Sequence, residues 1–136
     1  MPTFQRLEDI LAWQKARELV GEVYAVSSRG AFAKDFALRD QTRRAAISVA
    51  ANIAEGFGRG GSVEFAQFLA IAEGSLSELR SHLYLALDQD YLAKEEFAAL
   101  TRTVGAVDGL VGGLLAYLRH SEVKGVRYRR SPTPET

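Results

Sequence analysis

The stretch QTRRAAISVAANIAEGFGR, residues 41–59, decides the fold of this chain. Between Ala45 and Ala54 almost every residue is Ala, Ile or Val, which predicts a helix with apolar side chains over most of its circumference. We place this helix at about residues 36–55. The glycines from Gly56 onward predict its exit, because glycine tolerates the left-handed backbone of a helix end. Such a helix must be covered on more than one side.

A polar stripe interrupts this apolar surface. Its members are spaced three or four residues apart and therefore share one helical face. They are Gln41, Arg44, Ser48, Asn52, Glu55 and Arg59. Three interpretations are open. The stripe is a subunit interface with a hydrogen-bonded network, a ligand site in which Arg binds phosphate or carboxylate oxygens, or a solvated face with Glu55 and Arg59 as an ordinary i,i+4 pair.

Three further helices are predicted, over about residues 7–28, 62–88 and 94–120, since apolar residues recur in each at intervals of three or four. Asp35 and Ser62 are the predicted N-caps of the second and third helices. No strand pattern of useful length occurs. Four helices with short connections predict an all-α fold, an antiparallel up-down-up-down four-helix bundle.

The last predicted helix carries four interior glycines on one side. We call Gly105, Gly109, Gly112 and Gly113 the glycine face. Each glycine costs about 1 kcal/mol relative to alanine inside a helix. Four on one side indicate that another backbone approaches closely there, such as that of a neighbouring subunit. The alternative is that a long, stable helix tolerates them.

The bulk composition limits the class of protein. The 136 residues fit one domain, which we place at 1–120, followed by a basic tail, 121–136, predicted to be disordered. The 17 basic residues equal the 17 acidic ones, which argues against a nucleic-acid binder driven by net charge. The chain has no cysteine, no signal peptide pattern and no window with about 18 apolar residues. A cytoplasmic protein without a membrane span is therefore expected.

The charges are nonetheless unevenly placed, and this leaves room for local contacts with RNA or DNA. Residues 30–61 hold five basic and three acidic side chains, a net of +2, whereas residues 62–96 hold two basic and seven acidic ones, a net of −5. Basic side chains near an aromatic residue suit nucleic acid. The candidate contacts are Arg39, Arg43, Arg44, Arg59, Arg127, Arg129 and Arg130. The alternative for the arginines of the tail is that they only keep the protein soluble.

Nothing in the sequence points to an enzyme. No Ser has a positioned His partner, and His82 and His120 lack the acidic spacing of a metal site. The sequence GRGGS at residues 58–62 could hold an anion, but it lacks the Gly-Lys-Ser/Thr of a P-loop, and a plain helix-start turn is the simpler interpretation. We therefore expect no catalytic residue, cofactor, metal or small-molecule substrate.

Three segments, residues 7–24, 41–60 and 64–92, resemble the bacterial four-helix bundle proteins that are also called 23S ribosomal RNA intervening-sequence proteins. The most specific matches are the run NIAEG at residues 52–56 with Arg59, and the pattern of Phe68, Leu69, Ala72, Gly74 and Ser75. The resemblance covers roughly residues 4–118.

The resemblance implies a four-helix bundle that assembles into a ring-like homopentamer of poorly known function. A related pentameric bundle binds nucleic acid through a basic surface. This chain differs from that bundle, because its net charge is zero. The leading hypothesis is a non-enzymatic, self-assembling scaffold or adaptor associated with nucleic acid. The alternative is a structural protein-protein interaction module without nucleic-acid binding.

Overall fold

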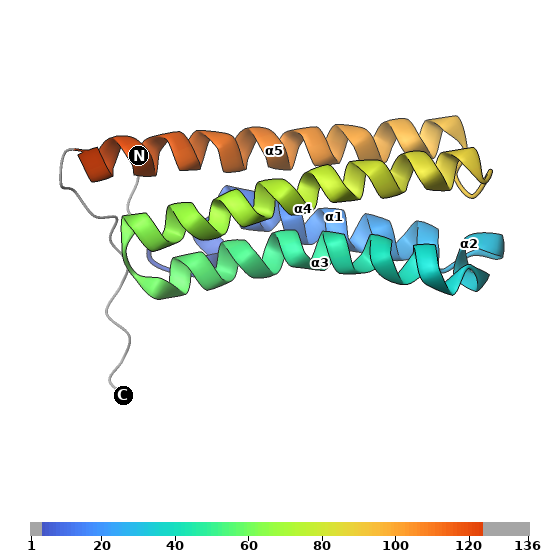
Figure 1. Ribbon diagram of the computed structural model, residues 1–136, viewed down its shortest axis with the longest axis horizontal. Coiled ribbons are helices and arrows are strands. Elements are labelled where there is room, and N and C mark those ends of the chain that lie inside the picture. Colours follow the sequence, from blue (N-terminus) through green and yellow to red (C-terminus); the bar gives the residue numbers. More distant parts are fainter. Residues whose placement is uncertain (1–3, 124–136) are drawn as a thin grey trace.

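The computed structural model describes residues 4–123, and all the regular structure in this range is helical. Four long helices lie side by side (Figure 1). The elements are the 3-10 turn η1 (Leu7–Asp9) and the helices α1 (Leu11–Ser27), α2 (Gly30–Lys34), α3 (Phe36–Arg59), α4 (Ser62–Asp88) and α5 (Lys94–Val123). An all-α bundle is therefore confirmed. The first predicted helix is shorter than expected, because the chain is extended at Ile10 between η1 and α1.

The core lies where the apolar stripes of the long helices meet. The predicted stripe of α4 and the seam of α5 are both buried, including Leu76 and Leu79 on α4 and Val104 and Val107 on α5. These side chains belong to one continuous cluster that also takes in α1 and α3. A periodicity of three to four residues places them on one side of each helix, so the sequence pattern alone predicts which of them become core.

The α3–α4 connection differs from the prediction. The helix α3 continues for four residues beyond the expected end and stops at Gly60, whose left-handed backbone has φ +88°. Gly56 therefore lies inside the helix. It is buried against α4, and a Cβ added there would lie 2.8 Å from Phe68 Cβ. The N-cap of α4 is Gly61, so the predicted capping role of Ser62 is wrong.

The connection between α1 and α3 contains a helical turn, α2, which lies outside the predicted helices. Asp35 caps α3 as predicted, since its Oδ1 accepts the Leu38 backbone N–H at 3.1 Å. Its other oxygen accepts the Tyr91 hydroxyl at 2.8 Å, and this hydrogen bond raises the pKa of the Tyr91 phenol. One carboxylate thus joins the start of α3 to the α4–α5 connection.

The start of α5 is held by Glu96. This carboxylate accepts the Ala93 backbone N–H at 2.9 Å and also pairs with the Arg29 guanidinium beyond the end of α1. Both contacts favour the ionised carboxylate, so the pKa of Glu96 is lowered. The helix then runs to Val123, three residues past its predicted end. The predicted tail is left as residues 124–136, which lie outside the described residues.

The outer side of α5 is open within the chain. A Cβ added at Gly105, Gly109 or Gly113 would meet nothing within 4 Å. The backbone predicted to approach the glycine face is therefore not supplied by the described part of this chain. By length and mean hydropathy, α5 also qualifies as a membrane-spanning helix, contrary to the sequence expectation. This is weak evidence for a membrane, because the core helix of a soluble protein passes the same test.

Candidate functional site

The middle of the polar stripe is a hydrogen-bonded network between α3 and α4. The hydroxyl oxygens of Ser48 and Ser75 lie 2.8 Å apart. Asn52 Nδ2 donates to the Ser48 carbonyl oxygen at 2.8 Å and to its Oγ at 3.0 Å. Ser48 and Asn52 are half-buried, and Ser75 is buried. These contacts satisfy polar groups that would otherwise cost free energy on burial, so this part of the stripe helps to hold two helices together.

The ends of the polar stripe are exposed. Glu55 and Arg59 form an i,i+4 ion pair at 2.9 Å, with about half of each side chain accessible, so the pair contributes little stability. The Arg59 guanidinium also lies over the Phe68 ring, 5.1 Å from its centre. Gln41 borders a shallow hollow beside His82. Arg44 is exposed and has no hydrogen-bond or ion-pair partner among residues 4–120.

Arg43 and Arg39, like Arg59, have partners within the chain, and both are among the arginines predicted to contact nucleic acid. Arg43 Nε donates to Ser27 Oγ at 2.8 Å, and its guanidinium covers the Tyr24 ring at 4.4 Å. Arg39 donates to the Ala33 carbonyl oxygen at 2.9 Å and to Asp40, and the Arg39 hydrogen bond lowers the pKa of the Asp40 carboxyl. Arg44 is left as the free cation of this cluster. Arg127, Arg129 and Arg130 lie outside the described residues.

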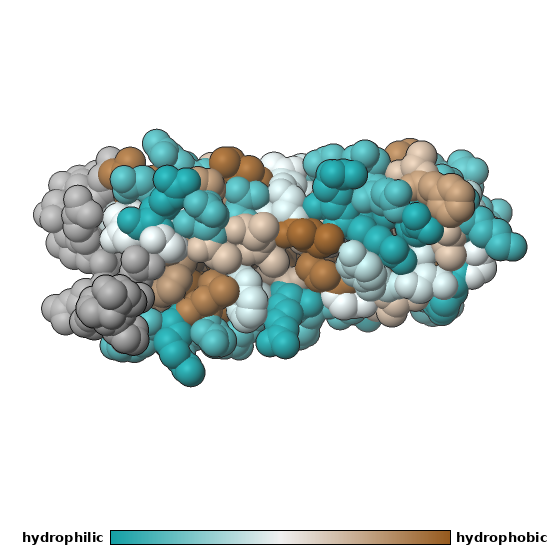
Figure 2. All heavy atoms as spheres, turned by 90° about the horizontal axis from the view of Figure 1, so that it is seen from below, coloured by the Kyte–Doolittle hydropathy of each residue, from teal (hydrophilic) through white to brown (hydrophobic). Residues whose placement is uncertain are grey.

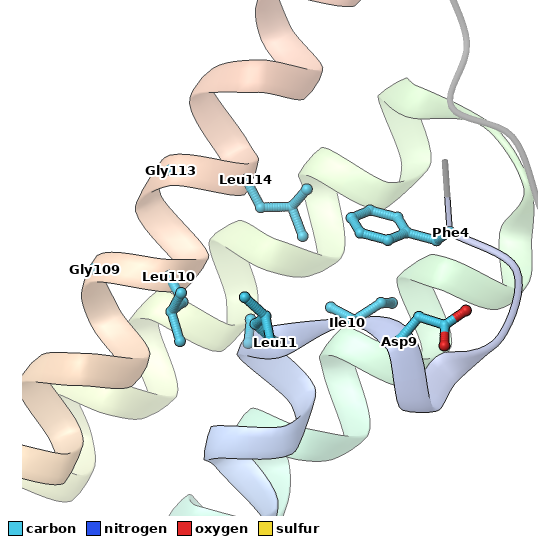
Figure 3. A pocket seen from close by; sticks show the side chains of 9 residues that line it. Phe4, Asp9, Ile10, Leu11, Gly109, Leu110, Gly113 and Leu114 are labelled. Atoms are coloured by element: carbon cyan, nitrogen blue, oxygen red, sulfur yellow. The ribbon is translucent and has the colours of Figure 1, made fainter. Parts of the chain in front are cut away.

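An apolar pocket that the sequence analysis did not predict lies between the N-terminal segment and α5. Its volume is about 440 Å³. Figure 3 shows the side chains of Phe4, Leu11 and Leu114 around the cavity, with Gly109 and Gly113 on the adjoining turns of α5. Leu11 is 62% exposed although it lies beside this pocket. The sequence signal for this pocket is Phe4, an aromatic residue that precedes the first predicted helix.

Glu73 is a second feature that the sequence analysis did not single out for a role. Its side chain is half-buried on α4, and its Oε2 lies 4.0 Å from the position of a Cβ built at Gly112 on α5. No hydrogen bond or ion pair joins it to another residue in the described part of the chain. Glu73 is therefore a half-buried carboxylate that no cation of the described residues neutralises.

His82 is the other unusual polar group. Both ring nitrogens are buried and lack a hydrogen-bond partner among the described residues. Glu78 Oε2 lies 3.5 Å from Nε2, within ion-pair distance but without forming a hydrogen bond. Within residues 4–123 no group of three His, Cys, Asp or Glu side chains could hold a metal ion.

Comparisons with known proteins agree with this architecture. The chain is similar to a protein of unknown function from the S23 ribosomal protein family of Bacteroides thetaiotaomicron, with a TM-score of 0.72 and 20% sequence identity over 78% of this chain and 96% of that one. No curated protein is significantly similar in sequence. The sequence model of the 23S rRNA-intervening sequence proteins matches residues 8–113. The chain therefore belongs to the 23S rRNA-intervening sequence protein family.

Proposed function

We propose that this protein is a non-enzymatic scaffold that several copies of the chain build in the cytoplasm by packing helix against helix. The outer side of α5 is the observation that carries the proposal. In the most apolar 18-residue window of α5, only 33% is buried within the chain. The glycine face is largely exposed. Leu11 and the adjoining pocket extend this apolar surface onto α1. Exposed surface of this kind is typical of a site that binds another protein.

The proposal takes the long helices as an antiparallel up-down-up-down bundle, which their short connections favour. It also takes the assembly to be a closed ring of identical subunits, with five copies suggested by the family resemblance. Glycines on an exposed helix face support helix packing between copies, because a bare backbone lets a neighbouring helix approach closely.

The mass of the purified full-length protein tests this function. We expect light scattering coupled to size-exclusion chromatography to give several times the single-chain mass of 14.9 kDa at micromolar concentrations. Replacing Gly109 by Leu should lower that mass and leave the helical circular dichroism spectrum unchanged, because a Cβ at this position meets no atom of its own chain within 4 Å. A single-chain mass for the wild-type protein at every concentration would overturn the proposal.

Nucleic acid is the second candidate partner, and one observation favours it. A surface hollow is lined by Tyr24, Arg43 and Arg44 together with Asp40 and Ile47. Tyr24 is 40% exposed and can contact a base, while Arg44 can pair with a phosphate. The neutral total charge limits the affinity that long-range attraction can provide.

A titration decides whether nucleic acid binds. The full-length protein and a variant that lacks residues 124–136 are mixed with structured RNA, single-stranded DNA and duplex DNA at low and near-physiological salt. We expect the tail deletion to weaken binding and to reduce its dependence on salt, because fewer counterions are released. Identical titrations would assign binding to the bundle, and no binding even at low salt would exclude this candidate.

A further inference from the structure

The helices α3 and α4 carry opposite net charges, and each carries a charged side chain without a hydrogen-bond or ion-pair partner in the described residues. Four arginines and two acidic residues give α3 a net charge of +2. Four acidic residues and one arginine give α4 a net charge of −3, with His82 neutral. Arg44 on α3 and Glu73 on α4 lack a hydrogen-bond or ion-pair partner in residues 4–120. They cannot be explained as members of an intrachain ion pair.

Each of these two residues lies beside exposed apolar or glycine positions on its own side of the bundle. Arg44, Ile47 and Ala51 follow one another at intervals of three and four residues and form what we call the α3 face. Ile47 is 43% exposed. Figure 2, which views the molecule from the side where α3 lies in Figure 1, shows apolar side chains among hydrophilic ones along the middle of this surface. Glu73 lies against Gly112, at the edge of the glycine face on α5.

The α3 face and the glycine face are separate surfaces of one chain. α1 and α4 each pack against both α3 and α5 and therefore lie between them. Two different complementary surfaces on each copy make a heterologous, head-to-tail contact, the kind that generates rings when the rotation closes. A surface that paired with itself would instead close at two copies.

We propose that the α3 face of one copy docks onto the glycine face of a second copy, with Arg44 of the first paired to Glu73 of the second. The planar Arg fork binds both carboxylate oxygens, and the half-buried position of Glu73 strengthens the pair. Ile47, one helical turn from Arg44, packs on the bare backbone of α5. This inference deepens the proposed scaffold function and rests on it, because it names the two surfaces that join.

Charge reversal of the two residues tests the pairing. In the full-length chain, Arg44→Glu and Glu73→Arg are each expected to raise the concentration at which the assembly forms by about tenfold or more, since like charges then meet at the interface. The double variant restores the pair with its signs exchanged and should assemble close to the wild-type concentration. Lys34→Glu, at an exposed site on α2, is the matched control and should assemble as the wild type does.

The possible results separate the two proposals. Single variants that assemble like the wild type would overturn the docking while leaving the scaffold function in place. So would single variants that dissociate and are not rescued by the double reversal. A wild-type protein that stays monomeric would overturn the scaffold and the docking together. Circular dichroism of each variant checks that the fold is retained, as expected for exposed Arg44 and half-buried Glu73.

Discussion

Replacing Ile53 with Asp is expected to unfold the chain. Ile53 is fully buried in the core, at 0% exposure. The substitution removes a large apolar side chain and places a carboxylate where no cation or hydrogen-bond donor is provided for it. Burial of an unpaired charge together with the loss of core packing costs more than about 4 kcal/mol, a large share of the stability of a domain of this size. The measurement is urea unfolding followed by circular dichroism at 222 nm.

Ala51→Asp is the matched control, because Ala51 lies on the same helix and is exposed. We expect it to keep the helical spectrum and to change the free energy of unfolding of the chain by less than about 1 kcal/mol. Its effect should instead be a lower assembled mass, since Ala51 belongs to the α3 face. If both variants unfold alike, or both stay folded, the assignment of Ile53 to the core and Ala51 to the surface is wrong.

Replacing Gly56 with Leu is expected to have the second large effect. A Cβ at this position would lie 2.8 Å from Phe68 Cβ and 2.9 Å from Phe65 Cδ1, closer than such atoms approach one another. The Phe65 Cα lies at 3.3 Å, so the clash also involves the backbone of α4. To accommodate leucine, α3 and α4 have to move apart. Overpacking of this kind costs about 1–3 kcal/mol or more, and thermal unfolding should show a lower midpoint.

Gly58→Ala is the control for this substitution. Gly58 also lies within α3, but a Cβ there meets nothing within 4 Å. The methyl group should therefore leave the stability unchanged or raise it by up to about 1 kcal/mol through helix propensity. A Gly56→Leu protein that melts at the wild-type temperature would show that the close approach of α3 and α4 is not required.

Only a part of the candidate site could be predicted from the sequence. Periodicity places Gln41, Arg44 and Ser48 on one side of α3, because a helix repeats every 3.6 residues. It says nothing about which of them meet another helix. Ser48 contacts Ser75, which is 27 residues away, whereas Arg44 contacts no partner in the described residues. The packing of α3 on α4 decides which residues of the stripe meet another helix. The sequence spacing of the stripe does not contain this information.

The sequence by itself determined the four long helices and their buried sides, because these follow from short-range periodicity and from capping by Asp35. Tertiary structure decided what depends on residues far apart in the chain. It made Gly56 a packing contact, assigned Arg43 to Ser27, and left the glycine face open. The physical reason is that a local pattern shows which side of a helix is apolar or bare. Only the packing of other helices shows whether that side is covered.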